Sequence, residues 1–191
     1  AKALGHKLVP TVPALVQLKC REEYLKSVAG VRAEARLTVF RKGVPVAEER
    51  GELQLTEQGI SGIPVFQLSR VVNYILAGGA AANGQASERK GRRRENLGPN
   101  LGTEGCSSGE GVEMRIDFLP DYSEEDFRLL CARRELLQGE RTVEEFFTGM
   151  LHKKLMLLFA RLAGLKVTED IAVADREKVA EVYRLCRDWR V

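Results

Sequence analysis

The sequence predicts an α+β protein, in which a small antiparallel β-barrel with one packed helix is followed by a helical subdomain. Two observations carry this prediction. The first third of the 191-residue chain consists of β-rich or alternating runs, whereas the last third repeats apolar residues at three- and four-residue steps. We therefore expect a β-barrel subdomain at residues 1–119 and a helical subdomain at residues 120–191.

The strands are predicted in four runs, at residues 12–20, 32–41, 44–56 and 112–120. A Lys-Gly pair between the second and third runs predicts a tight turn. Gly51 is expected to bend the third run into two strands, because glycine weakens a strand interior. Between the first two runs, residues 22–31 allow only a short helical turn, which Gly30 closes.

Helices are predicted where the apolar period changes to three and four residues. One begins at Pro64 and ends before Gly78. In the last third, Ser123 and Thr142 each precede an acidic residue by three positions, which is the pattern of a capping box. The apolar stripe after Thr142 predicts a helix that includes Met150 and Leu151, and further stripes predict helices ending at Gly164 and near the C-terminus.

Residues 80–111 differ from the rest of the chain and predict a long flexible loop, because they are rich in glycine and hold no aromatic residue. They carry a basic cluster made of Arg89, Lys90, Arg92, Arg93 and Arg94. The cluster could neutralise phosphates, but no aromatic residue is interleaved to stack bases, and Glu88 and Glu95 flank it. We favour a solvated loop over a nucleic-acid contact.

The composition narrows the function classes. A formal net charge of +3 is too mild to require a nucleic-acid or membrane partner, and no apolar run is long enough to span a membrane. Four widely spaced cysteines favour reduced thiols and a cytoplasmic setting. The chain holds no glycine-rich nucleotide fingerprint and no paired-cysteine or paired-histidine metal spacing, so we expect no metal and no cofactor cradle of its own.

The stretch LTEQGISGIPVF, residues 55–66, approaches the G-x-S-x-G turn of serine hydrolases. Ile63 stands where the last glycine should be, and a triad would need His6 or His152 beside Ser61. The favoured interpretation is structural: Gly59 supplies a turn with positive φ, and Ser61 caps the following helix. A functional interpretation stays open, in which the helix start and its glycines form a small anion or oxygen site facing a cofactor held by another domain.

The order of several motifs resembles the insert domain of a bacterial flavoprotein family, the NAD(FAD)-utilising dehydrogenases or FAD-dependent oxidoreductases with aminoacetone oxidase-like and bile-acid-reductase-like members. The motifs are GHKLVPTVPALVQL, GELQLTEQGISGIPVFQLSR, IDFLPDYSEEDF and GMLHKKL. The likeness covers nearly the whole chain apart from residues 80–111.

The resemblance implies that this chain covers the flavin and shapes the substrate pocket of a longer oxidoreductase, and that it is inactive alone. Its partner would be the FAD-binding Rossmann domain of the same polypeptide, with FAD and a small-molecule substrate bound in that longer protein. Thr56, Gly59, Ser61 and Gly62 match the family's most distinctive turn and would face the flavin or the substrate; no catalytic residue is implied. A helical turn cut short before Gly5 and an end on Val191 agree with a fragment.

Two other function classes stay open. The small barrel could be a binding module whose arginine-rich loop contacts RNA or a protein, in which case replacing Arg92, Arg93 and Arg94 by alanine would abolish salt-dependent binding. The insert could also be purely structural or oligomerising. The substrate, the electron acceptor, any use of NAD(P)H and the oligomeric state do not follow from the sequence.

Overall fold

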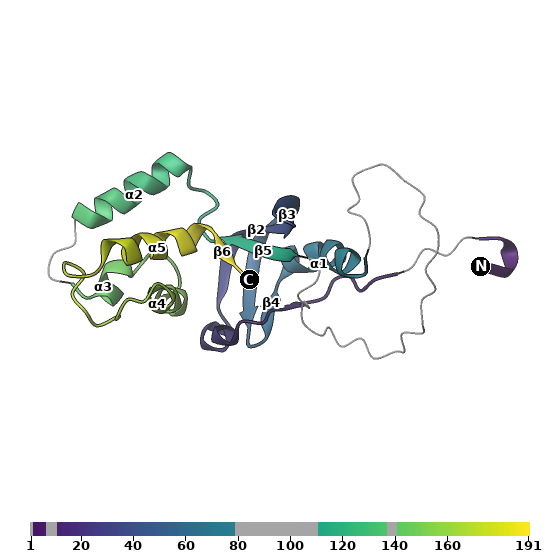
Figure 1. Cartoon of the computed structure of the whole chain (residues 1–191), viewed down its shortest axis with the longest axis horizontal. Helices are drawn as coiled ribbons and strands as arrows, with labels where there is room; N and C mark the ends of the chain where they lie inside the picture. Colours follow the sequence, from purple (N-terminus) through teal and green to yellow (C-terminus); the bar gives the residue numbers. More distant parts are fainter. Residues whose placement is uncertain (1, 7–10, 79–110, 137–140) are drawn as a thin grey trace.

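The computed structural model describes residues 2–6, 11–78, 111–136 and 141–191 (Figure 1). Within these ranges six strands form one antiparallel sheet that curves into a half-barrel, in the order β1–β4–β3–β2–β5–β6. The strands are β1 (Leu18–Lys19), β2 (Arg32–Arg41), β3 (Val44–Thr56), β4 (Gly59–Ser61), β5 (Val112–Asp117) and β6 (Trp189–Arg190). With the helices described next, this confirms the predicted α+β class.

The same ranges contain five α-helices and two short 3-10 helices. They are η1 (Lys2–Leu4), η2 (Glu23–Val28), α1 (Ile63–Leu76), α2 (Glu124–Leu136), α3 (Val143–Phe147), α4 (Lys153–Leu162) and α5 (Arg176–Arg187). Helix α1 packs against β2 to β5, whereas α2 to α5 gather beyond the other end of the sheet, where α4 and α5 contact η2, β5 and β6 (Figure 1). The predicted loop at residues 80–111 and its basic cluster lie outside the described residues, apart from Gly111.

The β2–β3 hairpin confirms the second and third predicted strands and the turn between them. Lys42 and Gly43 have φ values of 52° and 78°, which is the positive-φ pair that a type I′ hairpin turn requires. Gly51 does not divide the third run: it pairs with Ala35 inside the continuous strand β3. Its φ of 156° is one that L side chains rarely adopt, and an added Cβ would only reach ordinary contact with Pro64 Cδ, at 3.4 Å.

The first predicted strand is much shorter than expected. Only Leu18 and Lys19 pair with β4. Upstream, the backbone is bound to side chains of α1 instead, because Val16 N–H donates to Ser69 Oγ (3.3 Å) and the Pro13 carbonyl accepts from Asn73 Nδ2 (3.0 Å). Residues 11–17 therefore run beside α1 and do not join the sheet.

The helices follow the predicted apolar stripes, with one break. The capping box of Thr142 and Glu145 is present, and Ser123 Oγ accepts from the Asp126 N–H at the start of α2. The stripe after Thr142 is not one helix, because α3 ends at Phe147 and Gly149 takes a φ of 84°. Met150 therefore lies in a connecting loop before α4.

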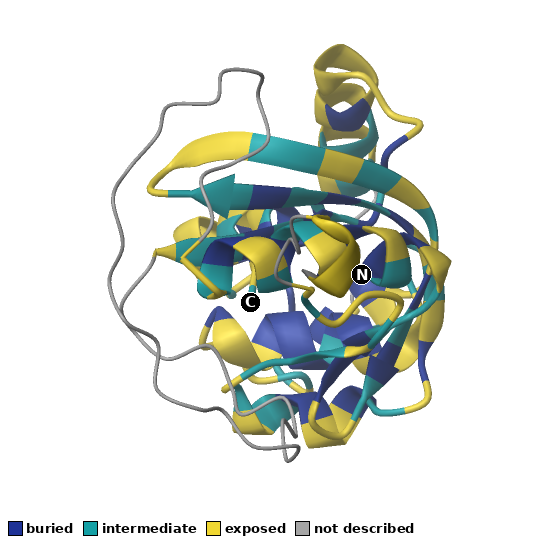
Figure 2. Ribbon diagram, turned by 90° about the vertical axis from the view of Figure 1, so that its right-hand side faces the viewer, coloured by how far each residue is buried: buried dark blue, intermediate teal, exposed yellow. Residues whose placement is uncertain are grey.

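One core joins the sheet to the helices. Trp189 of β6 is 1% exposed, and its ring lies 5.8 Å from that of Phe118 and 5.5 Å from that of Phe159 on α4. Tyr24 of η2 completes the cluster at 6.1 Å from Trp189. Figure 2 shows buried positions alternating with more exposed ones along the strands, as a sheet with one covered face requires. The division at residues 119 and 120 stays a prediction.

An ion pair is buried where the sheet meets α5. Arg187 Nε lies 3.3 Å from Asp117 Oδ1, and the two side chains are only 18% and 13% exposed. The carboxylate also accepts from the Leu119 N–H (2.8 Å), while the Arg187 guanidinium lies over the ring of Phe127. Burial nevertheless raises the pKa of Asp117, because desolvation outweighs these favourable contacts.

We expect Arg187→Leu to lower the free energy of unfolding at pH 7 by about 2 to 4 kcal/mol, because it leaves the Asp117 carboxylate buried without its counter-charge. The raised pKa of Asp117 means that the folded state holds its proton more tightly, so the loss should shrink as pH falls and the carboxyl is protonated. Urea unfolding at pH 7 and at pH 4 measures both effects. Arg190→Leu, at an exposed position, is the control; equal losses in the two variants would contradict the assignment.

Candidate functional site

The candidate site is the turn between β3 and β4 together with the start of α1. Glu57 and Gln58 make the turn, Thr56 pairs with Gly59, and Gln54 pairs with Ser61. The hairpin is fastened to β1 because the Cys20 N–H donates to the Gln58 carbonyl (2.9 Å). The chain thus passes from a two-residue turn through the three-residue strand β4 and Gly62 into helix α1.

Strand alternation sorts the side chains of this turn onto two faces. Leu53, Leu55 and Ile60 are at most 1% exposed and point into the core. Because partners that lie directly opposite in an antiparallel pair share a face, Thr56 and Ser61 lie on the outer face. Thr56 and Ser61 are partly exposed there, and no side-chain hydrogen bond is found for either one among the described residues.

The outer face of the sheet changes from charged to mostly uncharged side chains near the end of β3. Along β2 and the first part of β3 it carries ion pairs between Arg32 and Glu52, between Arg50 and Glu34, and between Arg50 and Asp121. Beyond Glu52, the outward side chains of β3 and β4 are the uncharged Gln54, Thr56 and Ser61, with Arg32 of β2 opposite Gln54 and Lys19 of β1 opposite Gly59. Ile63, the first residue of α1, is 70% exposed. We call this outer surface, made of Gln54, Thr56, Ser61 and Ile63, the neutral face.

Two glycines allow the strands to meet at the turn, for different reasons. A Cβ on Gly59 would overlap the carbonyl oxygen of Leu18 and lie 2.9 Å from Lys19 Cα, although the φ of Gly59 is not positive. A Cβ on Gly62 would overlap the Glu52 carbonyl, and Gly62 also takes a φ of 108°. The predicted positive-φ position at Gly59 is therefore wrong, and Gly62 has that role.

Ser61 does not cap α1. Gly62 occupies the N-cap position and no side chain closes the helix start, so the first N–H groups of α1 have no capping partner. No hydrogen bond joins Ser61 to His6 or His152 in the described part of the chain. His152 instead begins α4, where its Nδ1 accepts from the Lys154 N–H. The geometry gives no support for a serine nucleophile.

Ser69 of α1, which holds residues 11–17 in place, was not predicted from the sequence. It is fully buried, donates to the Phe66 carbonyl (2.7 Å) and accepts from the Val16 N–H. It thereby fixes residues 11–17 along α1. Its only sequence signal is a serine on the apolar side of the α1 stripe, which is equally typical of a small core position.

A first cavity opens at the seam between the two edges of the half-barrel. It measures about 210 Å³, and Leu18–Glu22 line one side of it. The other side is formed by the start of β5 and by Val191, and the floor by Ile60, Val72 and Leu76. Ile60 lies between two residues of the candidate turn, but its side chain points away from the neutral face.

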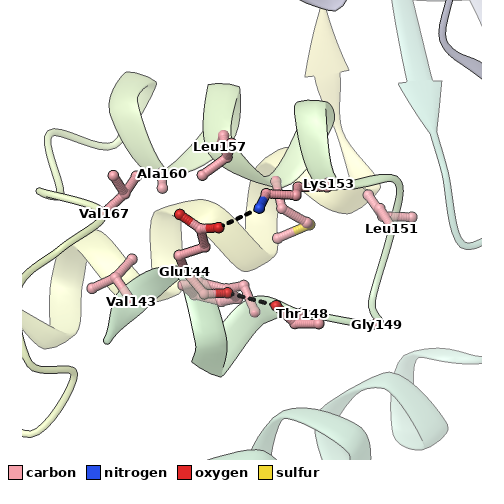
Figure 3. A pocket seen from close by; sticks show the side chains of 11 residues that line it. Val143, Glu144, Thr148, Gly149, Leu151, Lys153, Leu157, Ala160 and Val167 are labelled. Carbon is pink, nitrogen blue, oxygen red and sulfur yellow. Dashed lines mark hydrogen bonds and ion pairs between the residues drawn. The ribbon is translucent and has the colours of Figure 1, made fainter. Parts of the chain in front are cut away.

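A second cavity, of about 200 Å³, lies between α3 and α4 (Figure 3). Its lining is mostly apolar and includes Val143, Phe147, Met156 and Ala160. At its edge, Lys153 Nζ lies 2.6 Å from Glu144 Oε1, so the two charges satisfy each other. The sequence signal that could have predicted this cavity is the break between the apolar stripe of α3 and that of α4.

The described ranges give no support for a reactive thiol at Cys131 or Cys186 or for a metal site. Burial raises the pKa of Cys131 to about 11 and that of Cys186 to about 12, so both thiols are protonated at neutral pH and are poor nucleophiles. No group of three or more His, Cys, Asp and Glu side chains in the described ranges is arranged to hold a metal ion. Among the same residues, no helix is long and apolar enough to cross a bilayer.

Comparison with known proteins finds one family and one relative that this chain resembles. Residues 12–84, which include β1 to β4 and α1, match the family described as HI0933-like protein barrel and H2TH domain. This part of the chain therefore resembles the HI0933-like family. The 3-dehydro-bile acid delta(4,6)-reductase of Clostridium scindens is 29% identical over 187 residues. That alignment covers 98% of this chain but only 38% of the reductase, so the chain spans well under half the length of this relative.

We expect Gly59→Ala to lower the free energy of unfolding by about 3 kcal/mol, because the added Cβ forces the backbone of β1 away from β4. Gly43→Ala is the comparison variant: unlike Gly59, Gly43 has a φ of 78° that disfavours alanine, but nothing lies within 4 Å of the added Cβ, so it should cost only about 1 kcal/mol. Chemical denaturation of both variants measures the difference. A Gly59→Ala protein as stable as Gly43→Ala would show that the close approach to Leu18 is not required.

Proposed function

We propose that this chain is a domain of a FAD-dependent oxidoreductase, that it covers the flavin and shapes the substrate pocket, and that it is not catalytic alone. The observation that carries the proposal is the alignment in which 98% of this chain matches 38% of a reductase. A relative that acts as a reductase and contains the whole of this unit supports a part in a larger redox protein. FAD, bound mainly by the other domain, would supply the hydride or electron transfer.

The neutral face supports the contact that the proposal needs. A flavin ring is flat and largely uncharged, with carbonyl and nitrogen atoms at its edge, so it is matched by hydroxyl groups and an apolar side chain better than by an ion-pair ladder. Thr56 and Ser61 provide hydroxyls without side-chain partners among the described residues, and Ile63 provides the apolar surface. The first N–H groups of α1 add donors for an oxygen atom.

The residues present also explain why the chain would be inactive alone. His152 caps α4, Cys186 is buried with its thiol protonated, and the Asp117 carboxyl is held in the ion pair with Arg187. We therefore assign Thr56, Gly59, Ser61 and Gly62 to positioning a flavin-facing surface and propose no general acid or base among them. The two glycines act by allowing the close approach that fixes the hydroxyls.

The visible absorbance spectrum of the longer protein tests the proposal. We expect the flavin bands near the blue end of the visible range in the purified longer protein and their absence from this chain alone. A longer protein that takes up no flavin after incubation with FAD would overturn the proposal. The same outcome would favour the binding-module alternative.

A double variant of the longer protein, Thr56→Val with Ser61→Ala, tests the neutral face. Loss of hydrogen bonds worth about 1 kcal/mol each should raise the Kd for FAD about tenfold or more, without loss of folding. Flavin fluorescence during titration measures the Kd. Thr38→Val is the matched control, because Thr38 lies on the outer face of β2 and bonds to Glu48. Equal Kd values in the two variants would show that this face does not meet the flavin.

A further inference from the structure

The seam cavity lies between two strand edges whose backbone groups on the cavity side, at Lys19 of β1 and Val112 of β5, pair with no strand of the described residues. On β5, Met114 exchanges both backbone hydrogen bonds with Val191, each 3.0 Å long. Because the direction of these groups repeats every two residues, the N–H and C=O of Val112 point to the same side. The Gly111 carbonyl, one residue away, accepts from Lys42 on the opposite side, which agrees with this alternation.

The β1 edge has the same property on the other side of the cavity. The Cys20 N–H donates to the carbonyl of Gln58, the turn residue just before β4, so the backbone groups of Lys19 point away from β4. Lys19 and Val112 both line the cavity, and no strand of the described residues pairs with either one on that side. Two open edges facing one apolar cavity of about 210 Å³ are a site for an extended strand.

A third feature of the cavity is a buried carboxylate oxygen that lacks a hydrogen-bond donor within the described part of the chain. Glu22, which lines the cavity beside β1, has a buried Oε2 that accepts no hydrogen bond from the described residues. A buried carboxylate oxygen without a donor is costly, and a neighbouring strand supplies N–H groups. The floor beneath it is formed by Ile60, Val72 and Leu76, which favours apolar side chains on the inward positions of such a strand.

The register of β6 identifies the occupant. Trp189 pairs with Ile116, Arg190 with Arg115, and Val191 with Met114. The same antiparallel register, continued by two residues, brings a polypeptide that leads on from β6 opposite Val112 and into the cavity. Trp189 and Val191 both pack on the core, so the residue opposite Val112 takes the next inward position.

We propose that the seam is filled by the polypeptide that follows β6 in the longer protein, which pairs with β5 at Val112 and lies beside Lys19 of β1. This inference rests on the proposed function, because it requires a longer chain. The strand would close the half-barrel and would tie this domain to the segment that leads to the FAD-binding domain. It predicts a polar residue first and an apolar residue second after Val191.

Amide hydrogen exchange, compared between this chain and the longer protein, tests the inference. We expect the Val112 and Lys19 amides to exchange rapidly in this chain and about a hundredfold more slowly in the longer protein. The Met114 amide, already bonded to Val191, is the internal control and should be protected in both. Unchanged exchange at Val112 or Lys19 in the longer protein would overturn the inference.

The flavin spectrum separates the two proposals. Protected Val112 and Lys19 amides in a longer protein that binds no flavin would support the strand and contradict the redox function. Bound flavin with rapidly exchanging Val112 and Lys19 amides would support the redox function and overturn the strand.

Discussion

The rest of the structure depends on the burial of Trp189. This side chain comes from the last strand of the sheet, yet its ring contacts aromatic residues from η2, from the end of β5 and from α4. Aromatic rings bury large areas and hold defined relative orientations, so the cluster fixes the helices on the sheet. Because β6 follows α5 directly, the same residue also sets where α5 ends and where Arg187 meets Asp117.

A sheet held in this way can present functional surfaces at its edges without catalytic groups of its own. The inward residues of β3 and β4 belong to the core, and their outward neighbours make the neutral face. The seam lies on the far side of Ile60 from that face, so one short strand contributes to both. We propose that this domain contacts a cofactor on one side and continues into another domain on the other, so that β4 holds the two contacts in a fixed relative position. In this proposal, the two surfaces contact different partners.

Much of the fold could be predicted from local patterns. Strands β2 and β3 and helices α1 and α5 follow from alternation, period and turn chemistry, because their burial pattern repeats along the sequence. The errors arise where tertiary contacts override the local signal. Residues 11–17 are β-rich, but Ser69 and Asn73 of α1 take their backbone groups. The break after α3 depends on Gly149, which the apolar stripe concealed.

The sequence predicted a turn within residues 55–66, and the structure has one between β3 and β4, but the roles of its residues could not be assigned from sequence. Whether a glycine serves a positive φ or a close approach depends on the neighbouring strand, and only the three-dimensional position of Leu18 distinguishes Gly59 from Gly62. The Asp117–Arg187 pair joins residues 70 positions apart, so no sequence window could show it. The part of Thr56, Gly59, Ser61 and Gly62 in binding stays a prediction.

The central claim is that the neutral face of this domain lies against the flavin of a larger oxidoreductase. A crystal structure of the longer protein with FAD bound tests it most directly. The account predicts the flavin ring within contact distance of Thr56, Ser61 or Ile63, with the ion-pair ladder of β2 and β3 facing away. A flavin that lies instead against the charged ladder, or that makes no contact with β3, β4 or α1, would contradict it.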